Sequence, residues 1–218
     1  MLDASPKKPP GRTGQRGAYV NGEKKRGELV DAAFEVFAKW GFQRLSVRQI
    51  AEEIGTSHTA LLHHFGSKDA LLEAVLIRRE AIDGSHLRAL IDERGILDGL
   101  PEYMKYNAQR RNAIQLEVIL RAEAVRPDHP AHVFVRRRDQ AFYDAVMREL
   151  QDEQIAGRLK PGLDLSIVAR QITSTVEGNE RQWLYDDSID MSAQLRALMN
   201  LIRRPEANAQ DQTHKPSA

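Results

Sequence analysis

The chain has 218 residues, of which 41% are hydrophobic and 29% are charged, and its formal net charge is +1. A chain of this length can bury a full core in one or two domains. Cysteine is absent, which excludes disulfides and thiolate metal sites. No apolar run approaches the roughly 18 residues that a membrane span needs, and the basic N-terminus lacks the apolar core of a signal peptide. These features predict a soluble, cytoplasmic protein.

The charges are unevenly distributed along the chain. Residues 1–68 contain eleven Lys and Arg against seven Asp and Glu, a net charge of +4, so the remainder carries −3. A basic N-terminal part followed by a neutral to acidic body suits a protein whose first domain meets a nucleic acid. A chance difference of this size is the alternative.

Residues 1–22 are rich in Pro, Gly, Lys and Arg and show no apolar periodicity, which predicts a disordered segment. Lys7, Lys8, Arg12 and Arg16 could form an arm that contacts DNA phosphates or the minor groove. The alternative is a solvated tail without a role in binding.

A helix is predicted from Glu23 to Trp40, because apolar residues recur there with the spacing of one helix face. Gly41 ends it. We expect this helix to cover the next two, with Phe34 or Phe37 and Phe42 in a small shared core.

The stretch 46–68 has the pattern of two short helices joined by a tight turn. The first has apolar residues at the spacing of one buried face, and Ser46 is suited to cap it. Gly55 ends this helix at a position where a positive φ is needed, and Thr56 or Ser57 can cap the second helix. Two helices joined by a short turn containing Gly are the helix-turn-helix signature, in which the second helix enters the DNA major groove.

The order and spacing of this stretch resemble the TetR family of transcriptional regulators. The resemblance rests on a helix that ends in FAKWGF, then LSVRQIAEEIG, then TSHTALLHHFGSKDALL, and covers roughly residues 26–75. Thr59, Ala60, Leu62 and His64 depart from the residues that the family often has at these positions, which touch DNA or its phosphates in relatives. The resemblance implies an all-α fold, with a three-helix DNA-binding head followed by a helical bundle.

The predicted DNA contacts lie around the turn and the second helix. Arg48 can pair with guanine or with a phosphate, and Lys68, at the start of the next helix, is the expected phosphate ligand. No Arg or Lys lies between Thr56 and Gly66, so base readout would rest on small contacts and on binding as a dimer. For any single contact, a solvated polar surface is the alternative. The predicted set is Ser46, Arg48, Thr56, Ser57, His58, Thr59, Ala60, His63, His64 and Lys68.

The remainder of the chain has the pattern of helices separated by Gly and Pro. We expect a head at residues 23–70, a helical ligand-binding and dimerisation domain at residues 71–204, and a disordered polar tail at residues 205–218. With these helices the total is about nine, as the family resemblance implies. The expected helices are Lys68–Arg94, Leu97–Arg110, Asn112–Ala124, Ala131–Ala156, Asp164–Asp186 and Met191–Arg203.

The last two of these helices combine apolar with small residues. In the TetR family, two such helices from each subunit form a four-helix interface with twofold symmetry. The resemblance therefore implies a homodimer, although both helices could instead belong to the core of one chain. The expected interface residues are Ile172, Val176, Gly178, Leu195, Leu198, Met199 and Ile202.

The resemblance also implies a cavity for a small molecule inside the helical body. Aromatic residues on helices are more often core than ligand contacts, and Glu177 and Arg181 have the spacing of an ion pair. Glu117, Arg121 and Arg136–Arg138 are expected on solvated faces. The residues expected to line the cavity are Tyr103, Tyr106, Asn107, Leu116, Phe134, Phe142, Thr173, Glu177 and Trp183.

The sequence lacks the common motifs of enzymes: a glycine-rich phosphate loop, GxSxG and HExxH. Pro130 separates His129 from His132, and only Asp128 is nearby, which disfavours a metal site; no cofactor is expected. We therefore predict a homodimeric, ligand-responsive regulator, a repressor that binds a pseudo-palindromic double-stranded DNA operator. The alternatives are an activator with the same parts, or a dimeric ligand-binding protein with weakened DNA binding.

Overall fold

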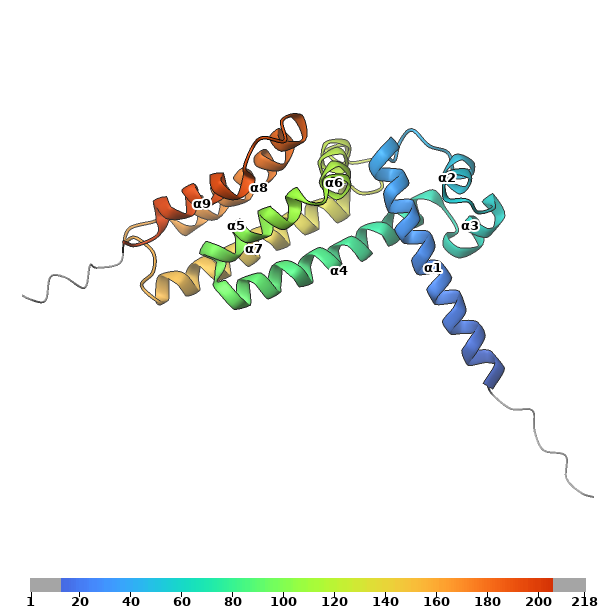
Figure 1. The fold of residues 1–218 in the computed structure, drawn as a ribbon, viewed down its shortest axis with the longest axis horizontal. Helices are drawn as coiled ribbons and strands as arrows, with labels where there is room; N and C mark the ends of the chain where they lie inside the picture. The colour runs from blue at the N-terminus through green and yellow to red at the C-terminus, as the bar shows by residue number, and fades with distance from the viewer. Residues whose placement is uncertain (1–12, 206–218) are drawn as a thin grey trace, which may run out of the picture. The chain divides into compact units, whose positions relative to one another are not determined.

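The computed structural model describes residues 13–205, with side chains from Gly22 onward, and this part of the chain folds into nine α-helices (Figure 1). None of these helices is long and apolar enough to cross a membrane. The predicted all-α fold is confirmed. The helices are α1 (Thr13–Trp40), α2 (Val47–Ile54), α3 (His58–Phe65), α4 (Lys68–Arg94), α5 (Ile96–Ala108), α6 (Arg111–Glu123), α7 (His132–Ile155), α8 (Leu165–Tyr185) and α9 (Met191–Ile202).

Helix α1 begins earlier than its sequence pattern predicts. The pattern starts at Glu23, whereas the helix starts at Thr13, so the prediction of disorder is wrong for residues 13–22. Once a helix is anchored by a buried face, each further residue gains a backbone hydrogen bond without a new nucleation step. The other residues of the predicted arm, Lys7, Lys8 and Arg12 among them, lie outside the described residues.

The chain divides into two compact units, residues 1–78 and 79–218, and the division falls inside α4. The predicted boundary after residue 70 is therefore earlier than the observed one. The reason is that the start of α4 carries Leu71, Leu72 and Val75, which are buried and belong to the first unit.

The first unit, which we call the head, has a small core of its own. Phe34, Phe37 and Phe42 are all buried, as predicted, and the rings of Phe37 and Phe42 meet edge to face with centroids 5.5 Å apart. Asp31 of α1 accepts a hydrogen bond from Arg78 of α4, with 2.6 Å between Arg78 Nη2 and Asp31 Oδ2. These contacts join α1 to the loop that follows it and to α4.

The second unit, which we call the body, is a bundle of α5 to α9 with the remainder of α4. Leu100, Met104, Leu150, Ile172 and Leu195 are fully buried in its core. Helix α9 packs on α5 and α8, and α7 packs on α8 (Figure 1). The body therefore has its own hydrophobic core, independent of the head.

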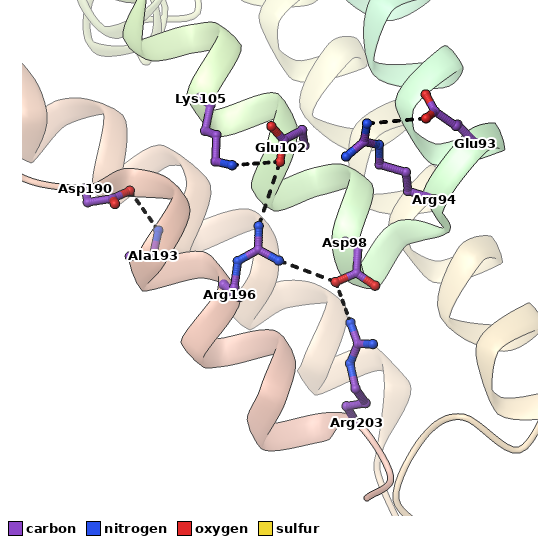
Figure 2. Close-up of polar contacts among 9 residues, drawn as sticks. All are labelled: Glu93, Arg94, Asp98, Glu102, Lys105, Asp190, Ala193, Arg196 and Arg203. Atoms are coloured by element: carbon purple, nitrogen blue, oxygen red, sulfur yellow. Dashed lines mark hydrogen bonds and ion pairs between the residues drawn. The ribbon is translucent and has the colours of Figure 1, made fainter. Parts of the chain in front are cut away.

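Ion pairs at the surface of the body join α5 to α9 (Figure 2). Arg203 Nη2 lies 2.8 Å from Asp98 Oδ1, and Arg196 Nη1 lies 3.5 Å from the same oxygen. Asp190 caps α9 by accepting the Ala193 amide hydrogen at 2.9 Å. Because the pairs are partly exposed, each contributes about 1 kcal/mol or less, and the apolar contacts beneath them dominate the stability of this helix pair.

Candidate nucleic-acid interface and cavity

Helix α2 is fixed at both ends by the predicted residues. Ser46 Oγ accepts the Gln49 amide hydrogen at 3.3 Å, and the Gln49 side chain accepts the Ser46 amide hydrogen at 2.9 Å, which completes a capping box. Gly55 ends the helix with a φ of +76°, which a residue with a side chain adopts only under strain. Thr56 N–H donates to the Ala51 carbonyl at 2.9 Å, so the turn into α3 is tightly held.

Helix α3 begins directly after this turn. Ser57 is its N-cap, because Ser57 Oγ accepts the Ala60 amide hydrogen at 3.0 Å. Leu61 and Phe65 are buried, and His58 and Thr59 are exposed. The start of α3 therefore directs polar side chains to solvent, as the second helix of a helix-turn-helix must to read base edges in a major groove.

The remaining residues of the predicted DNA surface differ in how exposed they are. Thr56, Ala60 and His64 are half-buried, and His63 is exposed. Ser46 is the exception in the set, because its hydroxyl donates to Gln49 Oε1 at 2.9 Å within the cap. In this conformation the Ser46 hydroxyl serves the cap of α2, and its role as a DNA contact stays a prediction.

Two of the expected DNA contacts are basic: Arg48 lies on α2, and Lys68 follows α3 at the start of α4. The side chain of Arg48 is 82% exposed and lies 3.3 Å from Glu52 one turn later on α2. An exposed pair of this kind contributes little to stability, so the guanidinium can exchange Glu52 for a phosphate or a base at little cost. The Lys68 ammonium lies 4.1 Å from the centre of the Phe42 ring. Lys68 is the first residue of α4, where the positive end of the helix dipole favours an anion.

A cavity of about 270 Å³ lies within the body, between α4, α5, α6, α7 and α8. Its lining combines apolar residues with eight charged ones. The apolar lining includes Leu87, Ile91, Ile96, Leu100, Phe142, Ala145, Val146 and Val176. The polar lining includes Glu80, Asp83, Arg88, Tyr103, Glu117, Arg121, Arg138, Asp139 and Glu180.

Glu180 is the most buried of the charged residues in this lining, with 2% of its surface exposed. Asn107 Nδ2 donates to Glu180 Oε1 at 3.0 Å, and Arg121 Nη1 donates to Glu180 Oε2 at 3.2 Å. Burial raises the pKa of Glu180 above its ordinary value, although the Arg121 charge acts in the opposite direction. No pattern in the sequence distinguishes Glu180 from Glu177, the other acidic residue of α8.

The prediction that the charged residues of α6 and α7 lie on solvated faces is partly wrong. Glu117, Arg121 and Arg138 line the cavity and form ion pairs there: Arg138 with Glu117, and Arg121 with Asp139 at 3.6 Å and with Glu180. Spacing does place Glu117 and Arg121, which are four residues apart, on one face of α6. The sequence does not show which face of each helix meets a cavity.

Of the nine residues expected to line the cavity, Tyr103 and Phe142 do so. The others serve the structure elsewhere in the body. Asn107 is buried and reaches the cavity only through Glu180, and the ring of Tyr106 lies against His86, with centroids 3.9 Å apart. The predicted residues that do not line the cavity are Tyr106, Asn107, Leu116, Phe134, Thr173, Glu177 and Trp183.

The expected interface residues on α8 and α9 differ in how far they are buried within their own chain. Gly178 and Leu198 are half-buried in one protomer and so remain accessible to a partner. The other five are buried in the hydrophobic core of their own chain. These five are Ile172, Val176, Leu195, Met199 and Ile202.

The two histidines weighed as metal ligands have structural contacts. His129 Nδ1 accepts the Ala131 amide hydrogen at 3.1 Å, and His132 Nδ1 lies 2.8 Å from the Ala124 carbonyl oxygen. Both rings therefore order the connection between α6 and α7. Among the described residues, no three His, Asp or Glu side chains are grouped closely enough to hold a metal ion.

The head also matches a known family model. Residues 29–75, which include α2, α3 and parts of α1 and α4, match the model described as bacterial regulatory proteins of the tetR family. The chain belongs to the TetR family. TetR family proteins are DNA-binding transcriptional regulators and not enzymes, so the geometry of α2 and α3 is that of a DNA-reading head.

Two TetR-like relatives and one solved structure extend the similarity into the body. The HTH-type transcriptional regulator UidR of Escherichia coli K12 is 24% identical over 156 residues, covering 70% of this chain and 78% of UidR. The HTH-type transcriptional repressor AcnR of Corynebacterium diphtheriae is 24% identical over 156 residues, covering 71% of this chain and 78% of AcnR. A transcriptional regulator from Saccharomonospora viridis, solved in complex with choline, has a TM-score of 0.71 at 18% identity, covering 84% of this chain and 99% of that one. The last comparison shows a shared fold.

Proposed function

We propose that this TetR family regulator is a ligand-responsive repressor that binds a pseudo-palindromic operator as a homodimer. The observation that carries the proposal is the capped α2–α3 pair, which presents His58 and Thr59 to solvent at the start of α3. Dimeric helix-turn-helix proteins contact half-sites about 34–36 Å apart, in successive major grooves. The similarity to AcnR, a transcriptional repressor, supports repression.

An outward stripe on α8 supports dimerisation. Ile167, Ser174, Gly178 and Tyr185 recur at helical spacing, and Ile167 and Tyr185 are 56% and 86% exposed in one protomer. A Cβ atom added at Gly178 would meet nothing within 4 Å, so a second helix can approach the backbone closely there. Leu201 of α9, which is 68% exposed, adds apolar surface. Exposed apolar residues in such a row are typical of a surface that another chain covers.

The cavity supports a response to a small molecule, as does the S. viridis structure with choline. Helix α4 begins at Lys68, one of the expected DNA contacts, and contributes Leu87 and Ile91 to the cavity lining. A ligand that binds the conformation without DNA more tightly shifts the population toward it by the difference in affinity. By the same linkage, DNA weakens the binding of the ligand.

Gel-shift titration with the DNA upstream of the protein's own gene tests the DNA-binding part. Arg48→Ala and Lys68→Ala should each weaken binding, and each lost phosphate contact should reduce the slope of log affinity against log salt by about 1. Arg148→Ala, which removes an exposed arginine of α7 in the body, is the matched control and should bind as the wild type does. Unchanged binding by both head variants would remove these residues from the interface.

A transcription assay from the same promoter tests the direction of regulation. Repression predicts that transcript levels fall when the protein is added and recover in the Lys68→Ala variant. A rise on addition would identify an activator. If the wild-type protein gives no salt-dependent shift of this DNA, the chain is a ligand-binding protein whose head no longer binds its own promoter.

A further inference from the structure

Apart from Arg88, which pairs with Glu149, the charged residues of the cavity lining lie toward one end of the cavity and the apolar residues toward the other. Glu80 pairs with Arg137 at 3.1 Å, and Arg88 pairs with Glu149 at 2.8 Å, so α4 and α7 run side by side in the same direction. Residues 80–83 therefore lie level with residues 138–139, and residues 87–91 level with residues 145–146. Because a helix rises about 1.5 Å per residue, the two ends are about 10 Å apart.

The charged end contains more acid than base. Three carboxylates from three helices, those of Glu117, Asp139 and Glu180, share two guanidinium groups. Arg138 pairs with Glu117, and Arg121 spans Glu180 at 3.2 Å and Asp139 at 3.6 Å. With every group ionised, this cluster carries one uncompensated negative charge.

The two other acidic residues of the lining, Glu80 and Asp83, are paired with arginines that lie outside the cavity lining. Asp83 lies 2.7 Å from Arg110 and 3.3 Å from Arg79, and Glu80 is paired with Arg137. None of these three arginines is part of the lining. A molecule inside the cavity therefore meets the acidic partner of each pair and not the basic one.

Each arginine of the lining already holds a carboxylate. Arg88 contacts Glu149, while Arg121 and Arg138 serve the acidic cluster. An anionic ligand would have to displace one of these carboxylates. A carboxylate, in contrast, has about four acceptor positions, so Glu180 can accept a further hydrogen bond beside those from Asn107 and Arg121.

Two further features favour a positive charge at this end. Burial raises the pKa of the Tyr103 hydroxyl, and the negative charges of Asp83 and Glu180 raise it further. Tyr103 and Phe142 both line the cavity, and the faces of aromatic rings attract cations. An incoming cation would also stabilise the ionised form of the buried Glu180 carboxylate, which burial disfavours.

From these contacts we propose that the effector is an amphipathic organic cation, a protonated amine with an apolar tail. The ammonium group lies among Glu117, Asp139 and Glu180, and the tail lies along Leu87 and Val146. This assignment rests on the proposed ligand response and names the chemical class of the ligand. The cavity, at about 270 Å³, is near the small end of ligand sites, which run from roughly 300 to 1,000 Å³, so a short-chain amine fits better than a drug-sized molecule.

Calorimetric titration of the full-length protein at pH 7 with three probes of equal chain length tests the assignment. The probes are hexylammonium, hexanoate and hexan-1-ol. We expect hexylammonium to bind at least tenfold more tightly than either of the others. The proposal is overturned if hexanoate or hexan-1-ol binds equally well, or if hexylammonium does not bind at millimolar concentration.

Glu180→Gln tests the residue at the centre of the cluster, because Gln keeps a side-chain oxygen for Arg121 but removes the charge. It should reduce hexylammonium affinity at least tenfold and leave hexan-1-ol binding unchanged. Glu177→Gln makes the same change on the same helix, outside the cavity lining, and should have no effect on hexylammonium affinity.

A second variant covers the case in which Glu180→Gln fails to fold. Asp139→Asn, at a half-exposed carboxylate, should also lower hexylammonium affinity. Equal hexylammonium affinity in the wild type and in the folded cavity variant would overturn the proposal.

A gel shift with hexylammonium separates this proposal from the proposed function. Release of bound DNA by hexylammonium, but not by hexanoate, supports both. If hexylammonium binds as expected in the calorimeter and DNA stays bound, the proposed ligand class is supported and the proposed ligand-responsive repression is contradicted.

Discussion

Ser57 fixes the first turn of α3 through Ala60: the Ser57 hydroxyl oxygen accepts the Ala60 amide hydrogen at 3.0 Å. His58 and Thr59 lie between these two residues and are exposed. The cap therefore determines where the first polar side chains of α3 point, because it sets the backbone from which they project. Since the hydroxyl accepts in this bond, its own hydrogen remains able to donate to a phosphate.

Ser57→Ala should lower the free energy of unfolding by about 1 kcal/mol, the usual loss for an N-cap serine. DNA binding should weaken as well, because the start of α3 loses its fixed direction. Denaturant unfolding and gel-shift titration measure the two effects. Thr59→Ala provides the contrast: it should weaken DNA binding and change stability by no more than about 0.5 kcal/mol, as expected for a surface substitution. A Ser57→Ala protein as stable as the wild type would show that the cap is not needed.

Gly178→Leu should weaken the dimer without destabilising the protomer. A Cβ atom added at Gly178 meets open space in one chain, and Leu is favoured over Gly in a helix by somewhat less than about 1 kcal/mol. Sedimentation velocity should show a larger fraction of monomer at equal protein concentration. Gly22→Leu places the same side chain in open space on α1 and should leave the monomer fraction unchanged. A Gly178→Leu protein that dimerises as the wild type does would place the interface elsewhere.

The buried Glu180 predicts a pH dependence of stability. Its pKa is raised from 4.5 in the folded protein, so the folded state binds a proton more readily than the unfolded state does. Stability from this group is fully present below pH 4.5 and is lost as the pH rises through the folded-state pKa. The free energy of unfolding of the wild type, minus that of Glu180→Gln, should therefore increase as the pH falls from 7 toward 4.5. A difference that is constant over this range, in denaturant unfolding, would contradict the raised pKa.

The helices of this protein could be predicted from the sequence because each carries its own apolar stripe and end signals. Ser46 and Gly55 fix the ends of α2 by local chemistry, and both act as predicted. The start of α1 could not be predicted in the same way. Its first residues form a helix without an apolar period, since a helix already anchored downstream can extend without one.

The surfaces of the body were harder to predict because an apolar stripe does not show which neighbour covers it. Ile172 lies on a stripe of α8 that could serve a dimer as well as a core, and it is fully buried within its own chain. Glu180 and Arg121 have the composition of a solvated face, yet they meet each other beside the cavity. Such pairings join residues far apart in the sequence, and no local pattern specifies them.

The stoichiometry and spacing of the DNA complex test most directly whether two copies of this head read two half-sites. Sedimentation equilibrium with a labelled operator fragment counts the protomers on each duplex. A second fragment, with about five base pairs (half a helical turn) inserted between the half-sites, moves them to opposite faces of the DNA. We expect two protomers on the natural operator and loss of that binding on the longer fragment. One protomer per duplex, or equal binding to both fragments, would contradict binding as a homodimer in successive major grooves.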